Sequence, residues 1–243
     1  MEILIDCEAS LMAVLQWLRS NRFLDSLAFG GDTMLRLCHE LPRYSLNLDF
    51  WLIKEEVNEE YYNRLNIALS HDHNVTDTQN GYSLILFELL RETIMHKLKI
   101  EIHKTIAPPG TTEEKIAFSP HFPSQVLVRG FTLGYMLKKK ALALIEYGEI
   151  LDAFDLEFLV RKGVSLDLTN EQKKGILLIL RGFRKREIDL KLGSILQPDL
   201  RAYYSQKGFD YLQEKLSFEP WGNETQNTAS LKAKRHIINQ MPT

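Results

Sequence analysis

A pair of glycines, a short helical pattern and an alternating strand follow one another between residues 29 and 51, FGGDTMLRLCHELPRYSLNLDFW. Apolar and polar residues alternate in the last part of this stretch, and a period of two is typical of a strand with one buried face. Asn47 and Asp49 therefore share the polar face of the predicted strand. Because glycine tolerates tight turns, the pattern predicts a strand, a turn, a helix and a second strand that presents polar side chains.

The rest of the N-terminal half mixes helical and strand patterns. We predict helices at 8–20, 32–41 and 55–69, and strands at 26–31, 45–53, 82–90, 94–104 and 125–131. The polar segment after residue 70 is predicted to hold an edge strand. Residues 105–124 contain four prolines and a glycine, which predicts a long loop. Asp32 or Thr33 is the predicted N-cap of the second helix.

The pattern changes near residue 132, and the remaining periodic segments are all helical. This order predicts an α+β fold with a mixed sheet, divided into residues 1–132 and a helical part at 133–243. The polar and then basic residues from Gly222 onward are predicted to form a loosely held tail.

Composition narrows the class of protein. Of the 243 residues, 44% are hydrophobic and 26% charged, with a formal net charge of −2, which is ordinary for a soluble globular protein. Two cysteines and no secretion signal favour a reducing compartment, and no apolar run approaches the length of a membrane span. We therefore expect a cytoplasmic protein with no membrane partner.

The Gly-Gly turn and the two strands suggest a chemistry. A glycine turn followed by a helix N-terminus lets backbone N–H groups approach a phosphate. Asp49 and Glu101, an acid on a later strand, supply the oxygen ligands that Mg²⁺ prefers. Together these features are typical of a metal site that handles a nucleoside triphosphate (NTP).

Three segments resemble one known family. GDTMLRLCHELPRYSLNLDF is similar to the first motif of the AbiEii-type nucleotidyltransferases, the toxins of certain abortive-infection toxin–antitoxin pairs. KLKIEI resembles the strand that carries the family's third acid, here Glu101, and KALALIEYGEILDAFDL resembles its lysine helix and Arg-Asp-x-x-Asp segment. The resemblance covers about residues 20 to 165.

The resemblance implies a nucleotidyltransferase (polymerase-beta-like) domain, a helical C-terminal domain and Mg²⁺-dependent use of an NTP. It also implies RNA, in some members tRNA, as the acceptor, and a cognate antitoxin as a partner. The implied catalytic residues are Asp49, Glu101, Lys140, Asp152 and Asp155, with Asp49 and Glu101 as metal ligands. The implied nucleotide-binding residues are Gly30, Gly31, Asp32, Thr33 and Asn47.

The sequence departs from the family pattern at three positions. Asn47 stands where the first acid is expected, and an amide is a weaker ligand for Mg²⁺ than a carboxylate. Asp32 replaces a small residue at the helix end that should attract phosphate. Leu151 replaces the arginine of the Arg-Asp-x-x-Asp segment. The scaffold is thus predicted to be retained and the site altered.

Structural interpretations of these residues stay open beside the catalytic ones. Asp32 fits an ordinary N-cap or a substitute metal ligand, and Glu101 fits a cross-strand charge partner. Asp152 and Asp155 share a helix face, where capping or salt bridges are as well supported as substrate contact. Two functions follow: an AbiEii-like nucleotidyltransferase toxin, or a catalytically degenerate relative that binds a nucleotide, RNA or a protein.

Overall fold

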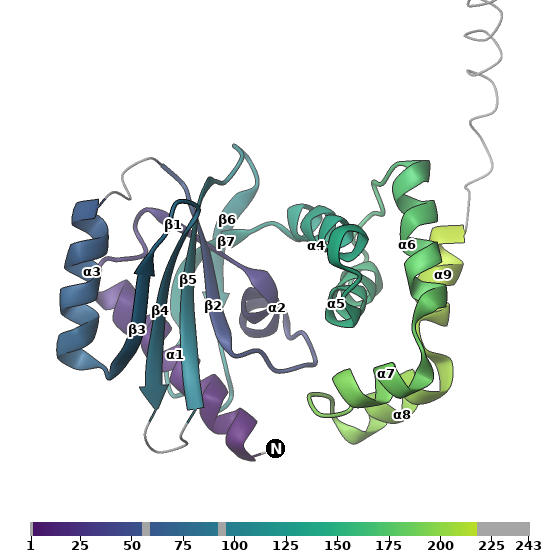
Figure 1. Ribbon diagram of the computed structural model, residues 1–243, viewed down its shortest axis with the longest axis horizontal. Helices are drawn as coiled ribbons and strands as arrows, with labels where there is room; N and C mark the ends of the chain where they lie inside the picture. The colour runs from purple at the N-terminus through teal and green to yellow at the C-terminus, as the bar shows by residue number, and fades with distance from the viewer. Residues whose placement is uncertain (1, 55–58, 92–95, 218–243) are drawn as a thin grey trace, which may run out of the picture.

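The computed structural model describes residues 2–54, 59–91 and 96–217, and within these ranges seven strands form one mixed sheet (Figure 1). The strand order is β3-β4-β5-β2-β1-β7-β6, so β1 and β2 lie near the centre. The strands are β1 (Leu27–Gly30), β2 (Asn47–Leu52), β3 (Val75–Asn80), β4 (Leu84–Arg91), β5 (His96–Ile106), β6 (Thr112–Ala117) and β7 (Val126–Phe131).

Helices cover both faces of this sheet. Helices α1 and α3 lie on one face and α2 on the other, with α4 to α9 arranged beyond α2 (Figure 1). The helices are α1 (Glu2–Ser20), α2 (Gly31–His39), α3 (Glu59–Asp72), α4 (Leu133–Tyr147), α5 (Ile150–Arg161), α6 (Asn170–Gly182), α7 (Lys185–Lys191), α8 (Pro198–Lys207) and α9 (Asp210–Ser217). The α+β class and the mixed sheet that the sequence predicts are confirmed.

The alternation in β2 divides its two faces as the sequence predicts. Leu48, Phe50 and Leu52 are at most 5% exposed, and the rings of Phe29 and Phe50 lie 5.2 Å apart between centroids. Burying a side chain such as Phe50 contributes roughly 2 to 3 kcal/mol to stability. The buried face therefore fixes the register of β2, and a shift of one residue would move Asp49 into the core.

The helical part is built around α5, which is buried on nearly every side. Ala153 to Val160 are all buried, although the segment includes two acids, Asp155 and Glu157. Helix α4 begins where the Thr132 hydroxyl accepts a hydrogen bond from the Tyr135 amide and ends at Gly148 in the left-handed conformation. With both ends of α4 fixed, Lys139 lies against Trp51 of the sheet and Lys140 pairs with Asp152 and Asp155 of α5.

Two predictions about local structure are wrong. Strand β6 lies inside the predicted loop 105–124 and pairs with β7 in antiparallel register. The prolines flank the strand rather than interrupt it, and an edge strand needs only one paired side. The N-cap of α2 is Gly30 and not Asp32 or Thr33, because the helix begins at Gly31 directly after β1.

Some predictions fall on residues that the structure leaves undescribed. The tail from Gly222, the first residues of the helix predicted at 55–69 and the start of the strand predicted at 94–104 lie outside the described ranges. Strand β7 ends at Phe131 and α4 begins at Leu133, while the division into domains at residue 132 stays a prediction. Among the helices described, none is long and apolar enough to cross a membrane.

Candidate active site

The register of three strands brings the two predicted metal ligands together. Gly30 at the end of β1 pairs with Asp49 in β2, and Asp49 lies directly opposite Glu101 in the parallel neighbour β5. Opposite residues of parallel strands point to the same face, so both carboxylates face the side of the sheet that carries α2. Glu101 and Asp49 are each only partly buried and remain accessible.

Gly31 lets the backbone pass close to Asp49. Its φ is +69°, and a Cβ at this position would lie 2.3 Å from Oδ2 of Asp49. A side chain here would therefore be strained and would collide with the carboxylate. The sequence suggested that a glycine is needed here so that a phosphate can approach the backbone. The structure shows that a glycine is also needed to leave room for the Asp49 carboxylate.

We expect Gly31→Ala to lower the free energy of unfolding by about 2 to 3 kcal/mol, because positive φ and the collision both oppose it. Gly148→Ala is the matched control, since Gly148 has φ +66° and nothing within 4 Å of an added Cβ. Urea denaturation of both variants measures the difference. Equal losses of unfolding free energy in the two variants would show that the close contact between Gly31 and Asp49 does not affect stability.

Asp49, Glu101 and His103 form a cluster with metal-ligand geometry. One ligand atom from each lies within 4.8 Å of the others. Burial and the negative charges of Asp32 and Glu101 raise the pKa of Asp49 to about 8. The hydrogen bonds and ion pairs of the described residues leave the Asp49 and Glu101 carboxylates unengaged. The donor set therefore fits a divalent cation, which would offset the repulsion between the acids.

His103 is held by an aromatic contact. Its ring stacks on Trp51, the residue opposite it in β2, with centroids 4.4 Å apart and planes 11° apart. The ammonium of Lys139 on α4 lies 4.2 Å from the Trp51 ring centroid. Burial and the charge of Lys139 lower the pKa of His103, so the imidazole is neutral at pH 7 and keeps a free lone pair.

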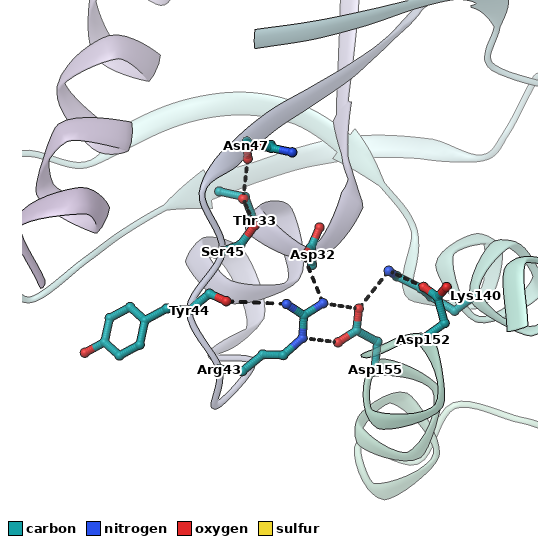
Figure 2. Close-up of polar contacts among 9 residues, drawn as sticks. All are labelled: Asp32, Thr33, Arg43, Tyr44, Ser45, Asn47, Lys140, Asp152 and Asp155. Atoms are coloured by element: carbon teal, nitrogen blue, oxygen red, sulfur yellow. Dashed lines mark hydrogen bonds and ion pairs between the residues drawn. The ribbon is translucent and has the colours of Figure 1, made fainter. Parts of the chain in front are cut away.

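A buried ion network lies beside this cluster, with Arg43 at its centre (Figure 2). The guanidinium forms two hydrogen bonds of 2.7 Å with the carboxylate of Asp155 on α5 and an ion pair of 2.9 Å with Asp32 on α2. The Arg43 side chain is 2% exposed and that of Asp155 is fully buried. Arg43 therefore joins the sheet half to the helical half, and its backbone also bridges to Leu196.

Lys140 belongs to the same network. Its ammonium lies 2.8 Å from Asp152 and 2.7 Å from Asp155, so the two acids that the sequence places on one helix face share this lysine (Figure 2). Burial opposes the charge of Lys140, but Asp155, Asp32 and Asp152 outweigh it and raise the lysine's pKa. Lys140 is thus charged and positioned at neutral pH.

Asp32 lies at the first turn of α2, where a phosphate was expected. Burial raises its pKa, but the charges of Arg43 and Lys140 outweigh this effect and the pKa falls to about 2. Asp32 is therefore ionised, and the repulsion of phosphate that the sequence predicts is offset in part by Arg43. An arginine does reach the Asp-x-x-Asp segment from another part of the chain, because the guanidinium of Arg43 donates to Asp155.

Thr33 and Asn47 connect α2 to the start of β2. The Thr33 hydroxyl lies 2.7 Å from that of Ser45 and also donates to the backbone carbonyl of Asn47 (Figure 2). Thr33 is fully buried and Asn47 is half-buried. These contacts fix the distance between the helix N-terminus and the acid-bearing strand.

Sequence reasoning missed three members of the site. Arg43 stands in a Leu-Pro-Arg-Tyr break and shows no periodicity that predicts burial. His103 shares the polar face of the strand with Glu101, and this spacing of two was a usable signal. Lys139 stands in a run of three lysines at 138–140, a pattern typical of a solvated helix face, although adjacent helix positions point about 100° apart and can face different partners.

A protein-family model and several solved structures are similar to this chain. The family model for the nucleotidyl transferase AbiEii toxin, type IV TA system, matches residues 15–219. No curated protein matches the chain.

Solved structures that share the fold include two nearly full-length matches. JHP933 from Helicobacter pylori has a TM-score of 0.56 at 17% identity, covering 97% of this chain and 99% of that one. MenT4, a nucleotidyltransferase toxin from Mycobacterium tuberculosis, has a TM-score of 0.55 at 16% identity, covering 95% and 93%. Because the family match spans most of its length, the chain belongs to the AbiEii nucleotidyltransferase toxin family of type IV toxin–antitoxin systems.

Proposed function

We propose that this protein is a toxin that transfers a nucleotidyl group from an NTP to an acceptor hydroxyl on RNA, with a divalent cation at Asp49 and Glu101. The observation that carries the proposal is the placement of these two carboxylates against the Gly31 turn, beside the N-terminus of α2. Acids, glycine turn and helix end are the parts that triphosphate chemistry requires.

The N-terminus of α2 is the proposed triphosphate site. Gly30 provides no side-chain cap, so the first N–H groups of the helix, from Gly31, Asp32 and Thr33, are not all satisfied internally. The helix dipole favours an anion at this end. Arg43 reduces the opposing charge of Asp32, and we propose that the backbone around Gly30 and Gly31 then approaches the phosphates closely.

The cation supplies Lewis-acid charge neutralisation at the phosphates when it is bound, and Mg²⁺ is the ion that the sequence predicts. Asp49 and Glu101 would hold it, and Asn47 lies on the same strand face as Asp49. The protein's own contribution in such a site is mainly alignment and charge placement.

We assign Lys140 to the developing negative charge on the phosphates. Its ammonium is held in place by Asp152 and Asp155, which act as positioning residues. The full burial of Asp155 supports this role over direct substrate contact.

RNA is the proposed acceptor, tRNA included, and the cytoplasm the proposed compartment. An exposed basic group at the end of α6 and the start of α7 fits an RNA backbone, since phosphate contacts come mainly from arginine and lysine. Its members are Arg181, Arg184, Lys185 and Arg186. Membership in a type IV toxin–antitoxin family supports a cognate antitoxin protein as the partner.

A second function has specific support. Asn47 lacks the charge expected of the first ligand, and both Arg43 and Lys140 are already paired with carboxylates in the structure. A site with fewer unpaired basic side chains and one carboxylate less would bind a nucleotide or RNA without catalysing nucleotidyl transfer. This degenerate form and the enzyme make opposite predictions in one assay.

The assay incubates the purified chain with each labelled NTP, total tRNA, and Mg²⁺ or Mn²⁺. We expect label to move to RNA only when the metal is present. Nucleotide binding that ignores the metal, with no transfer under any condition, would establish the degenerate form instead.

We expect Asn47→Asp to raise transfer about tenfold, because a second carboxylate two residues from Asp49 strengthens metal binding. Asn80→Asp, which adds the same charge on the edge strand β3, is the matched control and should leave transfer unchanged. The rate of label transfer at saturating NTP measures both. If the wild type is active and Asn47→Asp does not raise its rate, then Asn47 does not weaken the metal site.

A further inference from the structure

The position of His103 suggests a role that the family pattern does not assign. It follows Glu101 by two residues on β5, so both side chains leave the sheet on the same face. Its ligand nitrogen lies within 4.8 Å of the ligand oxygens of both Asp49 and Glu101. Three donors at such mutual distances can surround one ion.

The imidazole is held in this position before any ion binds. Trp51 lies opposite His103 in the register of β2 and β5, and the two rings stack at 4.4 Å. Phe131 in turn packs edge-on against Trp51, with the two ring centroids 5.2 Å apart. A ligand fixed by packing loses little side-chain freedom when it binds a metal.

Other side chains near the acids are less suited to complete the set. Asp32 is engaged by Arg43 at 2.9 Å, and Asn47 offers only a neutral amide. Among the described residues, the His103 side chain has no hydrogen bond or ion pair, and its ring stack on Trp51 leaves the nitrogen lone pair free. It is therefore the third donor that the structure places at this centre.

We propose that His103 is the third ligand of the metal centre and that it shifts the preference of this centre from Mg²⁺ to Mn²⁺. Mg²⁺ selects oxygen donors and near-ideal octahedral geometry, whereas first-row divalent ions also accept imidazole nitrogen. Mn²⁺ accepts carboxylate and water as well, so it suits the whole set of donors and a bound triphosphate. The inference rests on the proposed function only in taking Asp49 and Glu101 as metal ligands.

The test is pulsed electron paramagnetic resonance (EPR) of Mn²⁺ added to the metal-free chain, with competition by Mg²⁺. We expect a ¹⁴N coupling from a bound imidazole and Mn²⁺ affinity at least about tenfold above Mg²⁺ affinity. In His103→Phe, which keeps an aromatic ring against Trp51, the coupling should vanish and the preference should fall several-fold. His71→Gln changes a histidine that is 85% exposed on α3 and should leave both signals unchanged.

Three results would overturn the inference: no bound Mn²⁺, bound Mn²⁺ without nitrogen coupling, or a coupling and a preference that survive in His103→Phe. Circular dichroism of His103→Phe shows whether the variant is folded, and the ¹⁴N signal of the wild type decides the question if it is not. Nitrogen coupling without label transfer would uphold the ligand and sink the transferase proposal. Metal-dependent transfer without nitrogen coupling would uphold the transferase proposal and show that His103 is not a ligand.

Discussion

Replacing Arg43 by methionine is expected to lower the free energy of unfolding by about 3 to 5 kcal/mol, because it leaves buried acids without their main partner. Asp155 is fully buried and accepts two hydrogen bonds of 2.7 Å from the guanidinium, and Asp32 pairs with the same group. Methionine keeps much of the apolar volume but provides no charge. Urea denaturation at neutral pH measures the loss.

The control for this substitution is Arg19→Met, which breaks an exposed ion pair of 3.3 Å with Asp25. Such pairs contribute at most about 1 kcal/mol. The double variant Arg43→Met with Asp155→Asn should recover part of the loss, since the more deeply buried of the two uncompensated charges is gone. If Arg43→Met costs no more than Arg19→Met, the buried network does not join the two halves energetically.

Asp49→Asn is expected to reduce nucleotidyl transfer at least about 10³-fold, because the cation's Lewis-acid contribution amounts to several kcal/mol. The same variant is expected to be more stable than the wild type when metal is removed by a chelator. Burial and the charges of Asp32 and Glu101 raise the pKa of Asp49 from 3.8 to about 8. An amide mimics the protonated acid and escapes that repulsion.

The sign of the pH dependence follows from this raised pKa. The folded chain holds the Asp49 proton more tightly than the unfolded chain, so the wild type loses stability as pH rises from about 4 to about 8. Asp49→Asn should therefore match the wild type near pH 4 and exceed it by at least about 1 kcal/mol near pH 8.

Thermal or urea unfolding of both proteins across this pH range, in chelator, measures the difference. Asp77→Asn is the control, because Asp77 is exposed on the edge strand β3. A stability difference between the two proteins that does not vary with pH would contradict the raised pKa of Asp49. Full transfer activity in Asp49→Asn would show that Asp49 is not a metal ligand in catalysis.

The sequence predicts those elements best in which side-chain period and burial coincide. Strand β2 alternates because one face is packed under Phe29, and this pattern can be read without coordinates. Strand β6 was missed because an edge strand, with four of its six residues only partly buried or exposed, carries no clear alternation of apolar residues. The α2 N-cap was missed because β1 passes into the helix at Gly30 with no intervening turn.

The site shows the same division. The local spacing of Gly31, Asp49 and Glu101 is visible in the sequence, and strand register then brings the acids together. Arg43 has no local signal, because its partners Asp32 and Asp155 stand 11 and 112 residues away. The pairing of a buried charge is decided by which helices pack over it, and this is a tertiary property.

The amino-acid sequence by itself determined the class of fold, the strand that carries Asp49 and the family to which the chain belongs, because these depend on periodicity and ordered local motifs. Only the tertiary structure decided that Arg43 neutralises Asp32 and Asp155, and that His103 stacks on Trp51 beside the two acids. The physical reason is that charge pairing and ligand geometry depend on distances of a few ångströms, which are set by packing between segments far apart in the chain.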